Sequence, residues 1–162
     1  MIHLTNLLVA LVLVESGGVP NPPRGDGGRA IGPLQIHRIA VEDANRIIGR
    51  RRYRWEDCQH LEVSLEVATI LLTHYGDQLP HPATERDLAR IWNGGPDGWR
   101  QPSTLAYRVR VKRHLDRLRT ADAAPVRFKF DHQTTSYVPW EPSDDRDQAV
   151  ENPDWVTAPE PG

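Results

Sequence analysis

The stretch LTNLLVALVLVESGG, residues 4–18, decides the fold of this chain. It is apolar at almost every position until Glu15, and two glycines follow that residue shortly afterwards. Three of its leucines recur at helical spacing: Leu4, Leu8 and Leu11. Glu15 continues the same side of the helix. The pattern predicts a core helix over residues 3–15 that carries one carboxyl group on an otherwise apolar face.

Glu15 has two interpretations. A glutamate at a helix end is most often solvated. A buried glutamate resists ionising, because burial disfavours the charged form, and the apolar residues before Glu15 favour this second interpretation. Another carboxylate, Asp26, lies in a following loop rich in Gly and Pro. Two carboxyl groups in different environments, one protonated and one ionised, are what cleavage of a glycosidic bond requires.

Charge divides the chain into two parts. Residues 1–119 hold 17 Lys/Arg and 13 Asp/Glu, whereas residues 120–162 hold 3 and 9. We expect one mainly α-helical domain over residues 1–119 and an acidic, Pro-rich tail over residues 120–162 that is largely disordered. A short hairpin across residues 126–130 and 136–138 is compatible with the tail sequence. The mildly basic body favours an anionic polymer such as a cell wall or nucleic acid.

Four further helices are predicted from apolar periodicity and turn signals: residues 36–48, 56–75, 84–92 and 103–119. Residues 16–34 form a loop or a short irregular hairpin, because glycines and prolines crowd this segment. Thr84, with Asp87 three positions later, predicts a capping box. Ser103 is expected to cap the last helix.

Cysteine and histidine usage predicts neither a metal nor a cofactor. No Cys/His cluster has zinc spacing, and no phosphate-binding loop is present in the sequence. The single cysteine, Cys58, rules out an intrachain disulfide and is expected to be a small buried residue in an apolar helix. The apolar run over residues 7–14 lacks a preceding basic residue and a cleavage site, so it is interpreted as a core helix and not as a signal peptide or membrane span. The sequence leaves the localisation open and predicts a monomer.

Two blocks of sequence resemble a known family. The segments VESGG (residues 14–18), Asp26 and GPLQIH (residues 32–37) are similar to the catalytic region of the invertebrate-type lysozymes, the destabilase family. ARIWNGGPDGW (residues 89–99), followed by PSTLAY (residues 102–107), resembles that family's second conserved block. The Glu-Ser and Gly-x-x-Gln-Ile pieces also occur in lytic transglycosylases, whereas the Asn-Gly-Gly-Pro block is more specific.

The likeness extends over roughly residues 4–118 and has one large departure. Animal members of the family are rich in disulfides, whereas this chain has a single cysteine. The resemblance therefore implies a disulfide-free relative, which suits a bacterial protein.

The resemblance implies a lysozyme-like fold and hydrolysis of the β-1,4 bond between N-acetylmuramic acid and N-acetylglucosamine in peptidoglycan. The partner it implies is peptidoglycan or a chitin-like glycan. Glu15 would be the general acid and Asp26 the second carboxylate. The sequence alone leaves Asp26 open as a turn residue that bonds its own backbone. Glu15 would then act alone, as in lytic transglycosylases.

The resemblance also implies five substrate-binding residues: Gln35, His37, Asn93, Gly94 and Tyr107. Local chemistry offers each of them another role. Gln35 could satisfy loop backbone groups, His37 could cap a helix, Asn93 and Gly94 could form a turn, and Tyr107 could pack in the core. Trp92 and Trp99 could stack on sugars, although core or lid positions are commoner for tryptophan.

The runner-up class is a small helical module that binds nucleic acid. Its basis is two sets of basic residues: Arg50, Arg51, Arg52 and Arg54, and Arg108, Arg110, Lys112, Arg113, Arg117 and Arg119. Such runs are usually solvated faces, so no nucleic acid is expected as a partner.

An inactive relative that only binds glycan is a third alternative, against which the two carboxylates argue. Destabilase relatives have also been linked to isopeptidase activity. The spacing of serines and histidines in this sequence singles out no Ser/His pair for such an activity.

Overall fold

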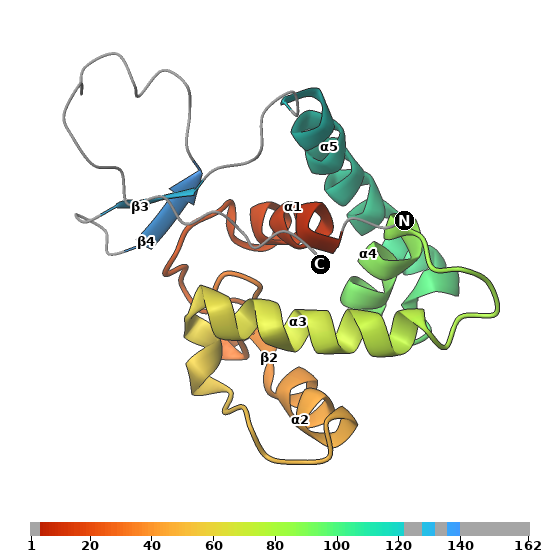
Figure 1. Cartoon of the computed structure of the whole chain (residues 1–162), viewed down its shortest axis with the longest axis horizontal. Coiled ribbons are helices and arrows are strands. Elements are labelled where there is room, and N and C mark those ends of the chain that lie inside the picture. The colour runs from red at the N-terminus through yellow and green to blue at the C-terminus, as the bar shows by residue number, and fades with distance from the viewer. Residues whose placement is uncertain (1–3, 122–127, 132–135, 140–162) are drawn as a thin grey trace, which may run out of the picture. The chain divides into compact units, whose positions relative to one another are not determined.

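The computed structural model describes residues 4–121, 128–131 and 136–139 (Figure 1). Chain contacts divide the protein into two units, residues 1–117 and 118–162, and each is described by itself. The described part is mainly helical, which confirms the predicted fold class, and its α-helices are α1 Leu4–Ser16, α2 Arg38–Ile47, α3 Leu61–Gly76, α4 Glu85–Gly94 and α5 Leu105–Ala121.

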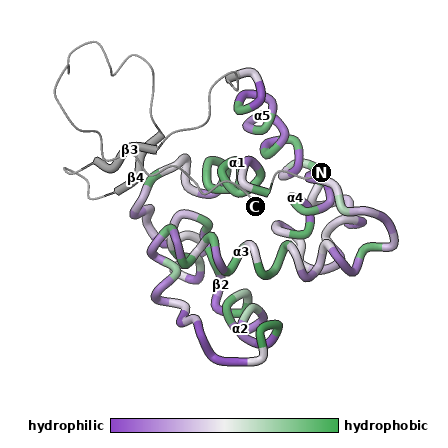
Figure 2. Tube along the Cα trace, viewed as in Figure 1, coloured by the Kyte–Doolittle hydropathy of each residue, from purple (hydrophilic) through white to green (hydrophobic). Residues whose placement is uncertain are grey.

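Helix α3 is central in the first unit. It contacts α1, α2 and α4, and Figure 1 shows it between α1 and α2. The hydropathy-coloured trace in Figure 2 shows α1 as hydrophobic along most of its length. The fully or almost fully buried residues of these helices form the core: Leu7, Ala10, Leu11, Val41, Ala44, Val67, Ala68, Leu72, Leu88 and Ile91.

Helix α1 matches the predicted core helix to within a residue at each end. Its deepest face is slightly rotated from the predicted one, because Leu7 and Ala10 are fully buried together with Leu11. Leu8, on the predicted stripe, is half-buried. Glu15 therefore lies at the edge of the buried face and not at its centre.

A two-stranded hairpin follows the Gly/Pro-rich loop and corrects the start of the second helix. Strands β1 (Ala30–Ile31) and β2 (Ile36–His37) are antiparallel, with Ala30 opposite His37. The helix expected from residue 36 begins at Arg38, because the two preceding residues pair with β1. The 3₁₀ turn η1 (Asp26–Gly28) leads into the hairpin.

The third predicted helix is divided, so its predicted start was wrong. A 3₁₀ turn, η2 (Glu56–Gln59), comes first; His60 is extended, and α3 begins after it. The carbonyl group of Cys58 accepts a 2.6 Å hydrogen bond from the hydroxyl of Ser64, which holds the break in place. Cys58 is fully buried in this turn, and burial raises the pKa of its thiol to about 12.

The predicted capping box at α4 is confirmed. The side chain of Thr84 accepts a hydrogen bond from the backbone N–H of Asp87, and the Asp87 carboxylate accepts one from the N–H of Thr84. Ser103 does not cap α5, because it lies in a 3₁₀ turn, η4 (Pro102–Thr104), that precedes the helix. Another 3₁₀ turn, η3 (Gly98–Arg100), packs against α4.

The second unit contains the end of α5 and a hairpin. Strands β3 (Phe128–Asp131) and β4 (Ser136–Pro139) pair antiparallel, close to the residues for which a hairpin was considered. The rest of the predicted disordered tail lies outside the described residues. Within the described ranges, no helix has the length and apolar character needed to cross a membrane.

Candidate active site

A cleft of about 870 Å³ opens beside the end of α1. Its walls come from α1, the loop and hairpin after it, α2, α3 and α4. Five of the seven catalytic and substrate-binding residues predicted from the sequence line it together: Glu15, Asp26, Gln35, His37 and Asn93. Residues that lie up to 78 positions apart in the chain, Glu15 and Asn93, thus face one space.

Glu15 is half-buried rather than solvated. Its Oε1 accepts a hydrogen bond of 2.6 Å from the Tyr107 hydroxyl and one of 3.1 Å from the Trp92 indole N–H. Burial raises the pKa of Glu15, and these two hydrogen bonds oppose that rise only in part. Glu15 therefore keeps its proton to a higher pH than an ordinary glutamate does.

The two hydrogen bonds also distinguish the carboxyl oxygens of Glu15. Both donors reach the same oxygen, Oε1. A proton on that oxygen would compete with the O–H and N–H groups that already point at it. The acidic proton therefore belongs on Oε2, and Tyr107 and Trp92 fix the orientation of the group that carries it.

Asp26 has a different environment. Its carboxylate forms a 2.8 Å ion pair with Arg29 and lies 3.6 Å from Nε2 of His37. The side chain is 47% exposed, so water and the Arg29 guanidinium solvate the charged form. The cleft thus combines a half-buried carboxyl group with a solvated carboxylate.

Gln35 spans the loop that carries Asp26. Its side-chain amide donates to the carbonyl groups of Gly32 (3.0 Å) and Pro23 (3.3 Å), as the loop-bonding interpretation expects. A Cβ at Gly25 would lie only 2.1 Å from Oε1 of Gln35, so the side chain needs a glycine there.

Two residues of this region adopt backbone conformations that side chains rarely tolerate. Asp26 has φ of 48° and Gln35 has φ of 47°. Such conformations cost about 1–3 kcal/mol each and cluster at functional sites. Both residues line the cleft.

The remaining predicted residues fall in two groups. His37 precedes α2 but makes no side-chain cap, and with Asn93 it lines the cleft. Gly94 is not among the lining residues: a Cβ there would lie 2.6 Å from Cγ2 of Thr104, so its small size serves packing between α4 and η4. Tyr107 is 4% exposed, so it packs in the core and reaches Glu15 only through its hydroxyl.

Sequence reasoning missed one contact and one wall of the site. Trp92 was considered for stacking, but its hydrogen bond to Glu15 was missed, because 77 positions separate the two residues and no local pattern links them. Trp99 is not among the cleft-lining residues and packs edge-on against the ring of His81. The α2 and α3 wall was also missed: Ile39, Ala40, Glu42, Asp43, Arg46, Leu71, Leu72 and Tyr75. Ile39, Asp43 and Arg46 recur at helical spacing and so share one face of α2. This spacing is the signal that would have predicted the α2 part of the wall.

No metal site is evident in the described part of the chain, where no group of three or more His, Cys, Asp or Glu side chains could hold an ion. The cleft holds two carboxyl groups in different environments, Glu15 and Asp26. Glu15 holds its proton to a higher pH than an ordinary glutamate, whereas Asp26 is paired with Arg29 and open to water.

Comparison with solved structures identifies the fold. No family model and no curated protein matches the chain. A chain in the crystal structure of Aeromonas hydrophila PliI in complex with Meretrix lusoria lysozyme is similar to it, with a TM-score of 0.57, 22% identity, and coverage of 67% of this chain and 87% of that one. The crystal structure of Tapes japonica lysozyme gives a TM-score of 0.56, 24% identity, and coverage of 66% and 86%.

The chain therefore has a lysozyme-like helical fold. More particularly, its structural neighbours are lysozymes of the invertebrate type, as the two sequence blocks predicted. At these identities the likeness concerns the fold, and the chemistry of the site rests on the geometry described above.

Proposed function

We propose that this protein is a lysozyme-like glycoside hydrolase that cleaves the β-1,4 bond between N-acetylmuramic acid and N-acetylglucosamine in peptidoglycan. The observation that carries the proposal is the half-buried Glu15, whose pKa is raised, in one cleft with the solvated Asp26. The lysozyme structures of similar fold support the broader assignment to sugar-cleaving enzymes.

The reaction begins with proton transfer from Oε2 of Glu15 to the glycosidic oxygen. The bond between that oxygen and the anomeric carbon breaks, and the leaving sugar departs as an alcohol. The Asp26 carboxylate stabilises the positive charge on the anomeric carbon or forms a bond to it. Ionised Glu15 then takes a proton from water, whose oxygen joins the anomeric carbon. Where Asp26 has bonded to that carbon, this step breaks the bond and releases the carboxylate. This division of roles between the two carboxyl groups is the one known for lysozymes.

The proposal gives the other cleft residues roles in binding and orientation. Tyr107 and Trp92 hold Oε1 of Glu15, so the proton on Oε2 is presented in one direction. Gln35, His37 and Asn93 line the cleft and carry amide or imidazole groups that suit sugar hydroxyls and N-acetyl groups. Gly94 supports the cleft indirectly, because its small size lets the end of α4 pack against η4.

The test is mass spectrometry of the fragments that the protein releases from purified peptidoglycan. Wild type should release fragments with reducing ends. Glu15→Gln should lose about 10²–10⁴-fold in rate, the usual contribution of general acid catalysis, and Asp26→Asn should also lose activity. Glu62→Gln, a change of an exposed glutamate on α3, is the matched control and should remain active.

Two other outcomes would overturn the proposal in different ways. Anhydro products that need Glu15 but not Asp26 would assign the protein to the lytic transglycosylases, in which the sugar closes a ring on itself without water. No release by folded wild-type protein would exclude both enzymes. Circular dichroism of each variant confirms that the fold is intact.

A further inference from the structure

The wall of the cleft formed by α2 and α3 carries an ordered group of charged and polar side chains. Asp43 is central: one of its oxygens accepts from the guanidinium of Arg46, through Nε at 3.0 Å and through Nη2, and the other accepts from the Tyr75 hydroxyl. Arg46 Nη2 also lies 3.4 Å from the Tyr75 hydroxyl oxygen. All three residues line the cleft.

These contacts hold Arg46 in one position while most of it stays accessible. Its side chain is 66% exposed, whereas that of Asp43 is 22% exposed. Asp43 and Tyr75 occupy Nε and Nη2 of Arg46, so the N–H donors of Nη1 are available to a ligand. Burial and the hydrogen bond to Asp43 raise the pKa of Tyr75, so its hydroxyl stays protonated and continues to donate.

Glu42 provides a separate negative charge on the same helix. It lies four positions before Arg46, a spacing at which opposite charges commonly pair. Instead Arg46 pairs with Asp43, and no ion pair of Glu42 is found among the residues the structure describes. Glu42 is exposed and lines the cleft. The wall thus presents a carboxylate without an ionic partner beside a guanidinium held in place.

We propose that this wall, formed by Glu42, Arg46 and the supporting Asp43 and Tyr75, binds a peptide group that carries both a free amine and a carboxylate. The amine would pair with Glu42, and the carboxylate would bind Arg46 through charge-assisted hydrogen bonds. The inference rests on the proposed function, under which the ligand is a stem peptide of peptidoglycan whose diamino acid keeps a free amine and a free carboxylate outside its peptide bonds, as diaminopimelic acid does.

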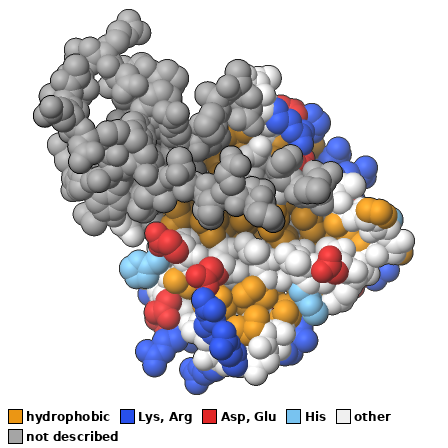
Figure 3. Space-filling model, in the orientation of Figure 1, with side chains coloured by type: hydrophobic (Ala, Val, Ile, Leu, Met, Phe, Trp, Pro, Cys, Tyr) orange, Lys and Arg blue, Asp and Glu red, His pale blue; other side chains and the backbone are white. Residues whose placement is uncertain are grey.

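A neutral sugar chain gives no reason for this charge arrangement. Unsubstituted chitin-like glycan has hydroxyl and N-acetyl groups but neither cations nor anions, so it would not need separated charges of both signs. The adjacent Ile39 is 73% exposed although apolar, and it also lines the cleft. Figure 3 shows hydrophobic side chains over the α2 region, next to basic ones. An apolar contact beside two charges suits a short peptide that contains alanine.

The first test measures kcat/KM on glycan strands with intact stem peptides and on the same strands after an amidase has removed the peptides. Wild type should prefer the strands that bear peptide. In Glu42→Gln and Arg46→Gln the ratio of the two values should fall about tenfold, the effect of losing one charge-assisted hydrogen bond. Glu62→Gln and Arg86→Gln, changes at exposed positions outside the cleft lining, should keep the wild-type ratio. An unchanged ratio in both cleft variants would overturn the proposal.

The second test separates this inference from the proposed function. The free tetrapeptide stem is titrated into Glu15→Gln protein and its Kd is measured by calorimetry. Binding that weakens about tenfold when Glu42→Gln or Arg46→Gln is added supports the peptide site even if wild type cleaves neither strand. Absence of peptide binding overturns the site even if wild type cleaves both strands, in which case the proposed hydrolase function stands without it.

Discussion

The hydroxyl of Tyr107 donates a 2.6 Å hydrogen bond to Oε1 of Glu15, and 92 positions of sequence separate the two residues. The bond joins α5 to the end of α1. It opposes the rise in the pKa of Glu15 that burial causes and assigns the acidic proton to the other carboxyl oxygen. Tyr107 thus contacts the Glu15 carboxyl group from the core and not from the cleft surface.

Tyr107→Phe should shift the alkaline limb of the pH–rate profile to higher pH. The general acid must be protonated, and loss of a hydrogen bond that lowers the pKa of Glu15 lets that pKa rise. At the wild-type optimum, kcat/KM should fall about tenfold because the carboxyl group is less well oriented. Activity against peptidoglycan is measured across the pH range.

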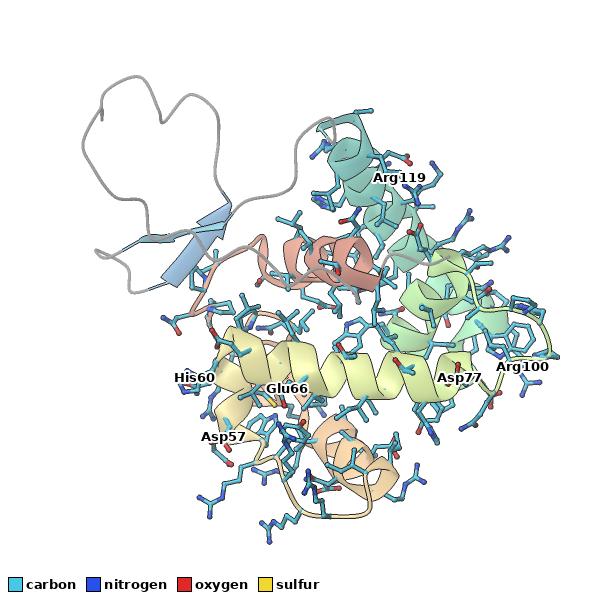
Figure 4. All side chains as sticks on the ribbon, in the orientation of Figure 1. Asp57, His60, Glu66, Asp77, Arg100 and Arg119 are labelled. Carbon is cyan, nitrogen blue, oxygen red and sulfur yellow. The ribbon has the colours of Figure 1, made fainter. Side chains whose placement is uncertain are left out.

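Tyr53→Phe is the matched control for this substitution. Tyr53 is also buried, and its hydroxyl donates a 2.6 Å hydrogen bond to Glu66. Glu66 lies on α3 and is labelled in Figure 4. Neither residue lines the cleft. The control should lose stability but keep the wild-type alkaline limb. A limb that stays in place in Tyr107→Phe, or moves to lower pH, would contradict the role given to Tyr107.

The stability of the fold should depend on pH through Glu15. Its folded pKa lies above the ordinary value of 4.5, so its contribution is fully present below the unfolded pKa and is lost as pH rises through the folded pKa. A glutamine in its place does not ionise. The melting temperature of Glu15→Gln minus that of wild type should therefore increase between about pH 4 and about pH 8.

Thermal unfolding at several pH values measures that difference. The exposed Glu62→Gln variant supplies the comparison and should give a nearly constant difference over the same range. If the curves of wild type and Glu15→Gln run parallel across the range, the carboxyl group is not buried as described.

Gly32→Ala should destabilise the protein far more than Gly49→Ala. Both glycines have positive φ, 72° and 70°, so both substitutions incur the same backbone strain of about 1 kcal/mol. Only at Gly32 would the new Cβ meet an atom, the carbonyl oxygen of Cys58 at 1.8 Å, whereas nothing lies within 4 Å at Gly49. Urea unfolding measures the two losses, and equal values would refute the close approach at Gly32.

Thr84→Ala should cost about 1 kcal/mol of stability, because it removes the N-cap of α4. Thr84 closes a reciprocal capping box with Asp87. Ser103→Ala is the internal control, since no cap hydrogen bond involves Ser103, and its effect should stay within about 0.5 kcal/mol. Denaturant unfolding of the two variants decides the matter: a loss for Ser103→Ala as large as that for Thr84→Ala would show that capping is not the cause.

Local pattern was enough for much of the secondary structure. The apolar run of α1 and the capping box at Thr84 were predicted correctly, because each depends on side chains and backbone within a few residues. The break before α3 was not predicted. The break depends on the carbonyl group of Cys58, which packs against Gly32 and accepts a hydrogen bond from Ser64. Gly32 belongs to the β1–β2 hairpin, and the periodicity of residues 56–75 carries no information about that hairpin.

The sequence by itself determined that a carboxyl group, Glu15, ends an apolar helix and that Asp26 follows in a loop of glycines. Only the tertiary structure decided which oxygen of Glu15 is held, what pairs with Asp26, and that α2 and α3 bring Glu42 and Arg46 into the same cleft. The physical reason is range: helical periodicity and capping act over a few residues, whereas burial and hydrogen bonding of a site group depend on whichever segments the folded core brings beside it.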